Sequence, residues 1–120
     1  MKKRISSFSY ALKGLKSVFL SEPNMKIHVG IAVLVVLMGF YFRISVYEWM
    51  ACVLCIGLVF SSEMFNTAIE TVVDLISPNV HPLAGKTKDI AAGAVLIVAI
   101  CSVIIGILIF LPKVLNLFIA

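Results

Sequence analysis

The sequence predicts an all-α integral membrane protein with an N-terminal amphipathic helix and three transmembrane helices. Hydrophobic residues make up 62% of the 120 residues and charged residues 13%, whereas soluble domains are roughly half apolar. Long apolar runs alternate with short polar segments, and most cations flank those runs on one side. These observations predict one membrane domain that spans residues 1–120.

The N-terminal segment, residues 1–21, carries apolar side chains at steps of three and four. These side chains are Ile5, Phe8, Leu12, Leu15 and Phe19. Lys13 and Lys16 lie off that stripe, which is typical of a helix on a membrane surface. The same two lysines interrupt the continuous apolar core that a cleavable signal peptide needs. Pro23 then begins a new element.

Three apolar runs predict membrane spans at about residues 25–45, 47–76 and 90–111. Tyr41, Tyr47 and Trp49 form an aromatic belt between the first two runs,. A helix over residues 47–76 would be about 45 Å long, and the apolar core of a bilayer is about 30 Å thick. Its last third is therefore expected to protrude. A loop over residues 77–88 and Pro112 bound the third span.

The cations predict the orientation of the spans. Six precede the first span and two lie between the second and third, which leaves two of the ten for the other side. The eight are Lys2, Lys3, Arg4, Lys13, Lys16, Lys26, Lys86 and Lys88. The other two are Arg43 and Lys113. The excess predicts a cytoplasmic N-terminus. Because these cations also match anionic headgroups, no nucleic-acid partner is expected.

The end of the second span carries an unusual polar stripe. With Glu63 at 0°, Asn66 falls at about −60°, Glu70 at about −20° and Asp74 at about +20° around the helix. Stacked like charges destabilise a helix unless something neutralises them. Acids near the apolar zone of a membrane protein usually have a function. The stripe therefore predicts a metal site that acts on a lipid.

Other residues are expected at the same membrane edge. Glu22 precedes the first span, so its carboxylate can converge with those of Glu63 and Glu70 to bind Mg²⁺ through hard oxygen ligands. Lys88 begins the third span and suits phosphate binding. A solvated acidic surface and ordinary lysine anchoring are the alternatives. His28 and His81 each fit either a headgroup contact or a packed polar residue.

Two ordered motifs carry a resemblance to a known family. The first is Glu63-Met64-Phe65-Asn66-Thr67-Ala68-Ile69-Glu70 with Asp74, and the second is Lys88-Asp89-Ile90-Ala91-Ala92-Gly93-Ala94-Val95-Leu96. Together they resemble the prokaryotic diacylglycerol kinase family, which includes undecaprenol kinase. The likeness extends from Lys13 to Leu108, which is most of the chain.

The resemblance implies a homotrimer that transfers the γ-phosphoryl group of ATP to a lipid hydroxyl with Mg²⁺ as cofactor. It implies that Glu63 is the catalytic base and that Asn66 positions groups at the site. Glu22 and Glu70 would bind the metal and, through it, the nucleotide. The other nucleotide contacts it implies are Lys88 and Asp89, with Lys13, Tyr10 and Gly85. Lys3 stands near the position of an arginine that contacts the nucleotide in the family.

The acceptor lipid is expected to be undecaprenol, which would give undecaprenyl phosphate. Glu22-Pro23-Asn24-Met25-Lys26-Ile27-His28 resembles the undecaprenol kinase branch, whereas related diacylglycerol kinases of Gram-negative bacteria typically carry an acid where His28 stands. With Glu63, His28 is a candidate substrate contact. Diacylglycerol, phosphorylated to phosphatidic acid, is the alternative acceptor. The expected location is the bacterial cytoplasmic membrane, with the site on the cytoplasmic side.

A proton-coupled transporter subunit is the alternative from another functional class. Such proteins place an acid in mid-membrane facing a cavity. Here the first and third spans contain no acids, and the acids cluster at one edge. A purely structural membrane peptide would leave the polar stripe without explanation. The pattern therefore favours a lipid kinase.

Overall fold

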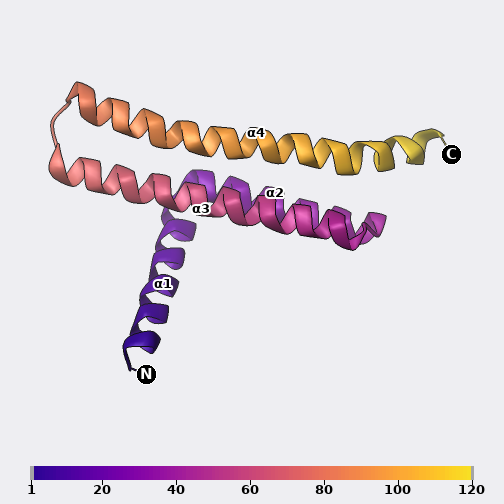
Figure 1. Cartoon of the computed structure of the whole chain (residues 1–120), viewed down its shortest axis with the longest axis horizontal. Coiled ribbons are helices and arrows are strands. Elements are labelled where there is room, and N and C mark those ends of the chain that lie inside the picture. The colour runs from indigo at the N-terminus through magenta and orange to yellow at the C-terminus, as the bar shows by residue number, and fades with distance from the viewer. Residues whose placement is uncertain (1, 120) are drawn as a thin grey trace.

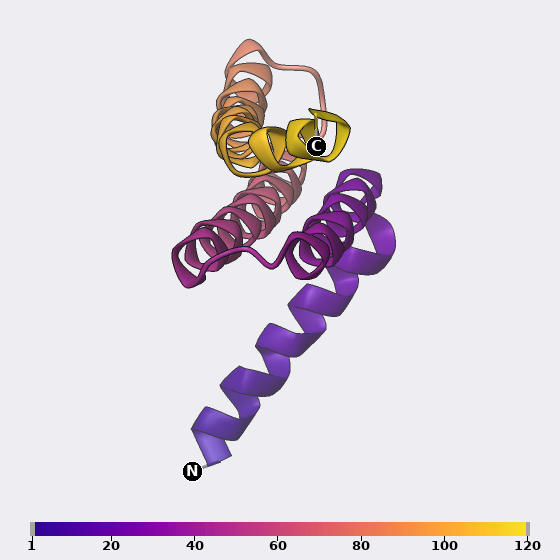
Figure 2. The same ribbon diagram turned by 90° about the vertical axis from the view of Figure 1, so that its right-hand side faces the viewer.

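The computed structural model describes residues 2–119 as four helices, α1 (Lys2–Ser21), α2 (Pro23–Phe42), α3 (Val46–Ile76) and α4 (Pro82–Ile119). Helices α2, α3 and α4 run side by side, and α1 projects from them (Figures 1 and 2). Within the described residues, these three helices are long and apolar enough to cross a membrane. The expectation of an all-helical chain with three apolar spans is confirmed.

A tight turn joins α2 to α3. Arg43 adopts a left-handed conformation with φ 51° and ends α2, and its N–H donates to the carbonyl oxygen of Phe40, a common way to satisfy the last carbonyls of a helix. Ser45 and Glu48 then form a reciprocal capping box at the start of α3, which satisfies two backbone N–H groups. The turn makes α2 and α3 antiparallel neighbours.

Gly39 allows α2 and α3 to approach each other closely beside this turn. A Cβ atom on Gly39 would lie only 2.6 Å from Cη2 of Trp49. The Trp49 ring also packs against Phe40, with 4.9 Å between the ring centroids. Only a glycine at position 39 leaves room for this indole ring.

The small core lies at the same end of the bundle. Its buried members come from the turn, α3 and α4, and are Ile44, Cys52, Ile109 and Phe110. Lys113 lies on α4, and its ammonium group donates hydrogen bonds to the carboxylate of Glu48 and to the carbonyl oxygen of Ile109. The ion pair links the beginning of α3 to the last part of α4.

Helix α4 is longer at both ends than the predicted span at 90–111. It begins at Pro82, where proline loses no helical hydrogen bond, and Nδ1 of His81 accepts from the N–H of Leu83. The predicted loop over 77–88 is therefore shorter. The helix also continues through Pro112, whose missing N–H removes one helical bond without ending the helix. The first span, in contrast, ends at Phe42 instead of 45.

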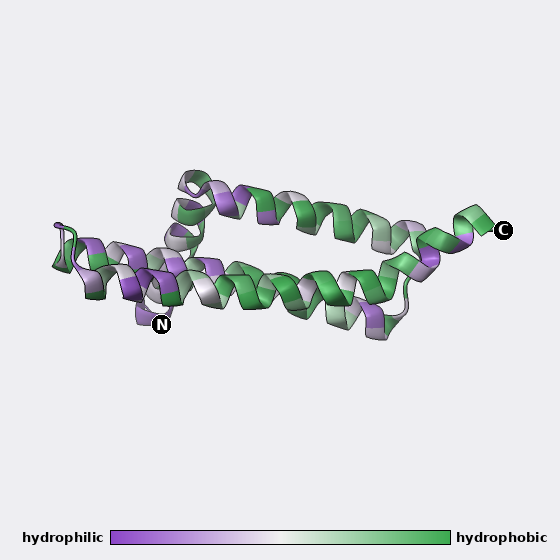
Figure 3. Cartoon of the chain, turned by 90° about the horizontal axis from the view of Figure 1, so that it is seen from above, coloured by the Kyte–Doolittle hydropathy of each residue, from purple (hydrophilic) through white to green (hydrophobic). Residues whose placement is uncertain are grey.

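Helix α1 contacts the bundle only through its last turns. Val18 is buried, and Phe19 packs edge-to-face against Phe60 on α3, with ring centroids 5.5 Å apart. The earlier apolar residues of the stripe, Ile5, Phe8 and Leu12, are exposed. Polar residues gather where α3 ends and α4 begins, and apolar residues cover the middle of the bundle (Figure 3). A lipid surface is the natural cover for such faces.

Candidate functional site

The first two residues of the polar stripe on α3, Glu63 and Asn66, point into the protein. Glu63 and Asn66 are 2% and 7% exposed, and no other polar or charged residue within 2–119 is classed as buried. Met25 at the start of α2 is completely buried at the same end of the bundle. Burial of an ionisable side chain is costly unless it is paired or hydrogen-bonded. The stripe is therefore an internal feature of the protein at Glu63 and Asn66.

Asn66 forms a hydrogen bond with the next acid along the helix, Glu70. Its Nδ2 donates to Oε1 of Glu70 over 3.2 Å, a contact that the spacing of four residues allows. Oδ1 of Asn66 and Oε2 of Glu63 are buried and have no hydrogen-bond partner in the described part of the chain. Buried polar atoms normally have partners. Two unpaired oxygens three residues apart on one helix are candidates for contact with a ligand.

His28 on α2 faces the unpaired oxygen of Glu63. Its Nε2 lies 3.6 Å from Oε2 of Glu63, and the imidazole is 17% exposed. That separation is longer than an N–H···O hydrogen bond, so the two groups face each other without bonding. Sequence reasoning left the role of His28 open, because the contact depends on how α2 packs against α3.

Asp74 and Lys88 form a separate ion pair beyond these residues. Nζ of Lys88 lies 2.5 Å from Oδ1 of Asp74, and their side chains are 39% and 63% exposed. The pair joins the last turns of α3 to the beginning of α4. Asp74 therefore neutralises a cation that the sequence assigns to phosphate binding, and it lies outside the buried part of the stripe.

No side-chain hydrogen bond or ion pair within residues 2–119 joins the remaining predicted site residues to Glu63, Asn66 or Glu70. Glu22 is half-buried at the N-cap of α2 and makes no side-chain capping bond. Tyr10 and Lys13 are exposed on α1, where the lysine lies over the tyrosine ring. Gly85 and Asp89 are exposed on α4. No group of three His, Cys, Asp or Glu side chains in residues 2–119 is close enough to hold a metal ion.

The polar atoms of the stripe nevertheless fit a hard cation. Glu70 offers a half-buried carboxylate, and the unpaired Oδ1 of Asn66 lies in the same turn. Carboxylate and amide oxygens are the ligands that Mg²⁺ accepts, and the ion usually keeps waters and substrate phosphates as its other ligands. One helix can therefore supply part of a magnesium site, but the expected convergence of Glu22, Glu63 and Glu70 does not occur within one chain.

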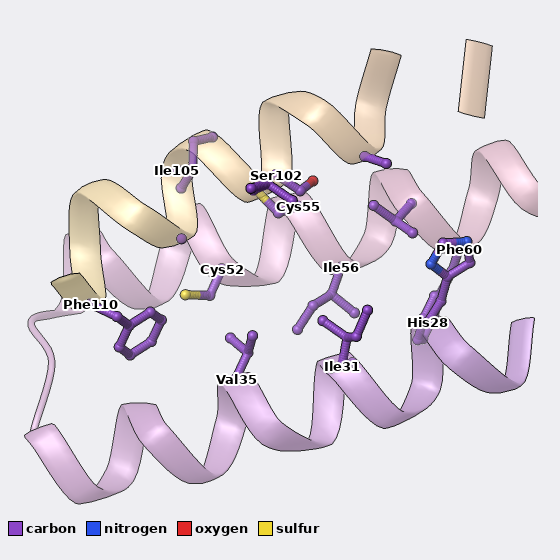
Figure 4. Close-up of a pocket in the computed structure, with 15 residues that line it drawn as sticks. His28, Ile31, Val35, Cys52, Cys55, Ile56, Phe60, Ser102, Ile105 and Phe110 are labelled. Atoms are coloured by element: carbon purple, nitrogen blue, oxygen red, sulfur yellow. The ribbon is translucent and has the colours of Figure 1, made fainter. Parts of the chain in front are cut away.

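An apolar groove leads to this site between α2, α3 and α4. It has a volume of about 270 Å³. Figure 4 shows His28 and Phe60 at one end and Phe110 at the other, with Val35, Ile56 and Ile105 between them. Sequence reasoning missed this groove, because a helix that faces lipid and one that lines a groove carry the same apolar residues. The site thus combines a buried carboxylate with space for a hydrocarbon chain.

The comparison with family models agrees with this arrangement. The model for prokaryotic diacylglycerol kinase matches residues 9–110. The match includes the whole polar stripe, His28 and Lys88, and it excludes only the first turns of α1 and the last turns of α4.

Individual relatives point the same way. An undecaprenol kinase of Bacillus subtilis is 49% identical over 107 residues, which are 89% of this chain and 87% of the relative. The diacylglycerol kinase of Haemophilus influenzae is 36% identical, over 82% of this chain and 83% of its own. That of Escherichia coli K12 is 34% identical, over 83% and 82%. The chain therefore belongs to the prokaryotic diacylglycerol kinase family, as its two motifs predict.

Proposed function

We propose that this protein transfers the γ-phosphoryl group of ATP to the hydroxyl of a membrane lipid alcohol, with undecaprenol as the favoured acceptor. The observation that carries the proposal is the buried, unpaired Oε2 of Glu63 beside the end of an apolar groove. Family membership and the undecaprenol kinase of Bacillus subtilis support the acceptor class. Diacylglycerol is the second candidate, because other relatives are diacylglycerol kinases.

In this proposal Glu63 is the general base. The lipid hydroxyl donates its proton to Oε2 while its oxygen attacks the γ-phosphorus, and the bond from that phosphorus to the ADP oxygen breaks. A base must lie within hydrogen-bond reach of the proton that it accepts. The carboxylate is 2% exposed, so little water competes for that position. Positioning and charge stabilisation supply most of the rate in phosphoryl transfer.

Glu70 and Glu22 are the proposed ligands of Mg²⁺, which when bound would offset the charge of the transferred phosphoryl group. Asn66 keeps Glu70 in place through the hydrogen bond from its Nδ2. An amide in this position orients the carboxylate without adding charge. The half-buried Glu22 precedes α2, so it reaches the same edge of the membrane from another helix.

The nucleotide is proposed to lie over the polar end of the bundle. Lys88 and Asp89 begin the apolar part of α4, and Lys88 would offset phosphate charge as a compact cation. Tyr10, Lys13 and Gly85 are further proposed contacts. Their exposure leaves these groups accessible to a ligand from the aqueous phase.

The proposed setting is the cytoplasmic membrane of a bacterium, with α1 on the cytoplasmic surface. Eight of the ten cations then lie on the cytoplasmic side,. A homotrimer is proposed, because within residues 2–119 no three acidic, His or Cys side chains come together to hold a metal and neighbouring subunits can complete the site. Chemical crosslinking in membranes should give a ladder that ends at three subunits.

The direct test measures transfer from radiolabelled ATP to undecaprenol and to diacylglycerol side by side. Glu63→Gln keeps the size of the side chain and removes the base, so we expect at least about a hundredfold loss of turnover. Near-normal turnover by this variant would exclude Glu63 as the base.

Glu48→Gln is the matched control, since it makes the same change in α3 at the opposite end of the bundle. Its carboxylate pairs with Lys113 and takes no part in the proposed reaction. We expect turnover close to that of the unaltered protein. If both variants lose turnover equally, the loss reflects assembly and not proton transfer.

A further inference from the structure

The imidazole of His28 is the only nitrogen-bearing side chain among the fifteen residues that line the groove. Ser102 on α4 contributes the only hydroxyl, and the remaining lining is apolar apart from two cysteines. His28 lies at the end where Glu63 is buried (Figure 4). A lipid in the groove would therefore meet its polar contacts at His28.

A single hydroxyl oxygen could bond to both His28 and Glu63 if it lay beside the two groups, since 3.6 Å leaves no space for an atom between them. The 3.6 Å from Nε2 to Oε2 is too long for a direct hydrogen bond, but one oxygen atom can lie roughly 2.8 Å from both. A hydroxyl can donate one hydrogen bond and accept another. With the proton of the imidazole on Nε2, the hydroxyl would accept from His28 and donate to Glu63, whose Oε2 is otherwise unpaired.

We propose that His28 determines the acceptor, by holding the hydroxyl of a single-chain lipid alcohol against Glu63 while the chain lies in the groove. This inference rests on the proposed lipid kinase function. During transfer His28 keeps its proton, the hydroxyl proton passes to Glu63, and the new bond joins the lipid oxygen to phosphorus. His28 contacts the reacting oxygen but exchanges nothing with it.

The lining of the groove explains the preference for a single chain. The lining on α4 extends from Ala99 to Phe110, which is about 16 Å at about 1.5 Å per residue, so the groove holds only the part of the lipid nearest its hydroxyl. Diacylglycerol would bring two ester groups into that length. Ester carbonyls in apolar surroundings lose hydrogen bonds to water, which costs binding energy. A hydrocarbon chain with a terminal hydroxyl has no such groups.

The test compares kcat/KM for a single-chain polyprenol and for diacylglycerol in the full-length protein, His28→Leu and His28→Gln. Loss of one hydrogen bond to the acceptor should lower kcat/KM for the polyprenol by about 5- to 150-fold. The KM for ATP should not change, and the preference over diacylglycerol should shrink. His28→Gln keeps a donor near the position of Nε2 and should recover most of the activity.

His81→Asn is the control, because it removes the other imidazole and keeps an acceptor at the start of α4,. It should preserve both the rate and the preference for the polyprenol. The inference is overturned if His28→Leu keeps the preference, or if it lowers the rates with both lipids and weakens ATP binding by the same factor. Absence of transfer to either lipid by the unaltered protein would instead overturn the proposed function.

Discussion

The ammonium group of Lys88 on α4 lies 2.5 Å from the carboxylate of Asp74 on α3. Both side chains are more than one third exposed, so solvent screens the pair and it adds little stability. The pair holds the Lys88 cation at the polar end of the bundle. In the proposed function, this weak pair lets Lys88 exchange Asp74 for a phosphate oxygen.

The two members of this pair should therefore differ in their effect on activity. Asp74→Asn should change the KM for ATP by less than about threefold, since an exposed pair contributes little. Lys88→Met removes the cation itself and should lower kcat/KM for ATP by on the order of a hundredfold, as loss of a charge contact to phosphate does. Steady-state kinetics with varied ATP distinguish these results. Equal losses in both variants would show that the pair acts only as a unit.

Glu70 should control the metal requirement. Glu70→Gln keeps the hydrogen bond from Asn66 available but replaces a charged ligand, so we expect the Mg²⁺ concentration for half-maximal activity to rise by about tenfold or more. A titration of activity against Mg²⁺ measures this change, with Asp74→Asn as the control variant. An unchanged titration curve would contradict the assignment of Glu70 as a ligand. Addition of a chelator should abolish transfer in the unaltered protein.

Filling the groove should weaken acceptor binding. Gly106 lines the groove, and a Cβ atom there would meet nothing within 4 Å, so we expect the side chain of Gly106→Leu to extend into the groove. We expect the KM for the lipid alcohol to rise by on the order of tenfold, since pocket methylenes have effects of this size. The KM for ATP should stay constant.

Gly57→Leu is the matched substitution for this experiment. Gly57 is also open to a Cβ atom, but it lies outside the groove lining. The variant should bind the lipid alcohol as the unaltered protein does. A similar rise in KM for both variants would mean that the bulk of leucine matters and its place in the groove does not.

The ion pair at the other end of the bundle should affect stability without affecting chemistry. Lys113→Met leaves the partly buried Glu48 without its cation, although the capping box with Ser45 still satisfies the carboxylate in part. Thermal unfolding in detergent should therefore begin at a lower temperature. The turnover of the folded fraction should be unchanged. A large loss of turnover in fully folded Lys113→Met protein would show that the Lys113–Glu48 pair affects the candidate site.

The sequence predicts the helices and the polar stripe because both depend on local periodicity. The second span was expected at 47–76 and α3 covers Val46–Ile76, since a long apolar run and a nearby Pro78 bound it. The signal Ser45-x-x-Glu48 has the form of a capping box, and the structure contains that box at the start of α3. Pro112 was expected to end a helix that in fact continues, because one missing hydrogen bond does not stop a helix that remains packed.

The contacts between helices could not be predicted from the sequence. The approach of His28 to Glu63, the groove, and the Lys113–Glu48 pair all depend on which faces of neighbouring helices meet. The family resemblance was confirmed by the comparisons, because its motifs are long and ordered. The roles of all the candidate site residues stay predictions, Glu22, Tyr10, Lys13, Gly85 and Asp89 included, since each role depends on a bound ligand.

The Gly39–Trp49 contact connects the packing at the turn to the angle between α2 and α3. The Trp49 ring lies too close for a Cβ atom on Gly39, so even an alanine there requires either a shift of the ring or a separation of α2 from α3 at the turn. A rigid helix carries such a tilt along its length, and His28 lies eleven residues away on the same helix. Position 39 is roughly 16 Å from His28 along α2, at about 1.5 Å per residue. If the helices separate at the turn, the distance between His28 and Glu63 changes as well.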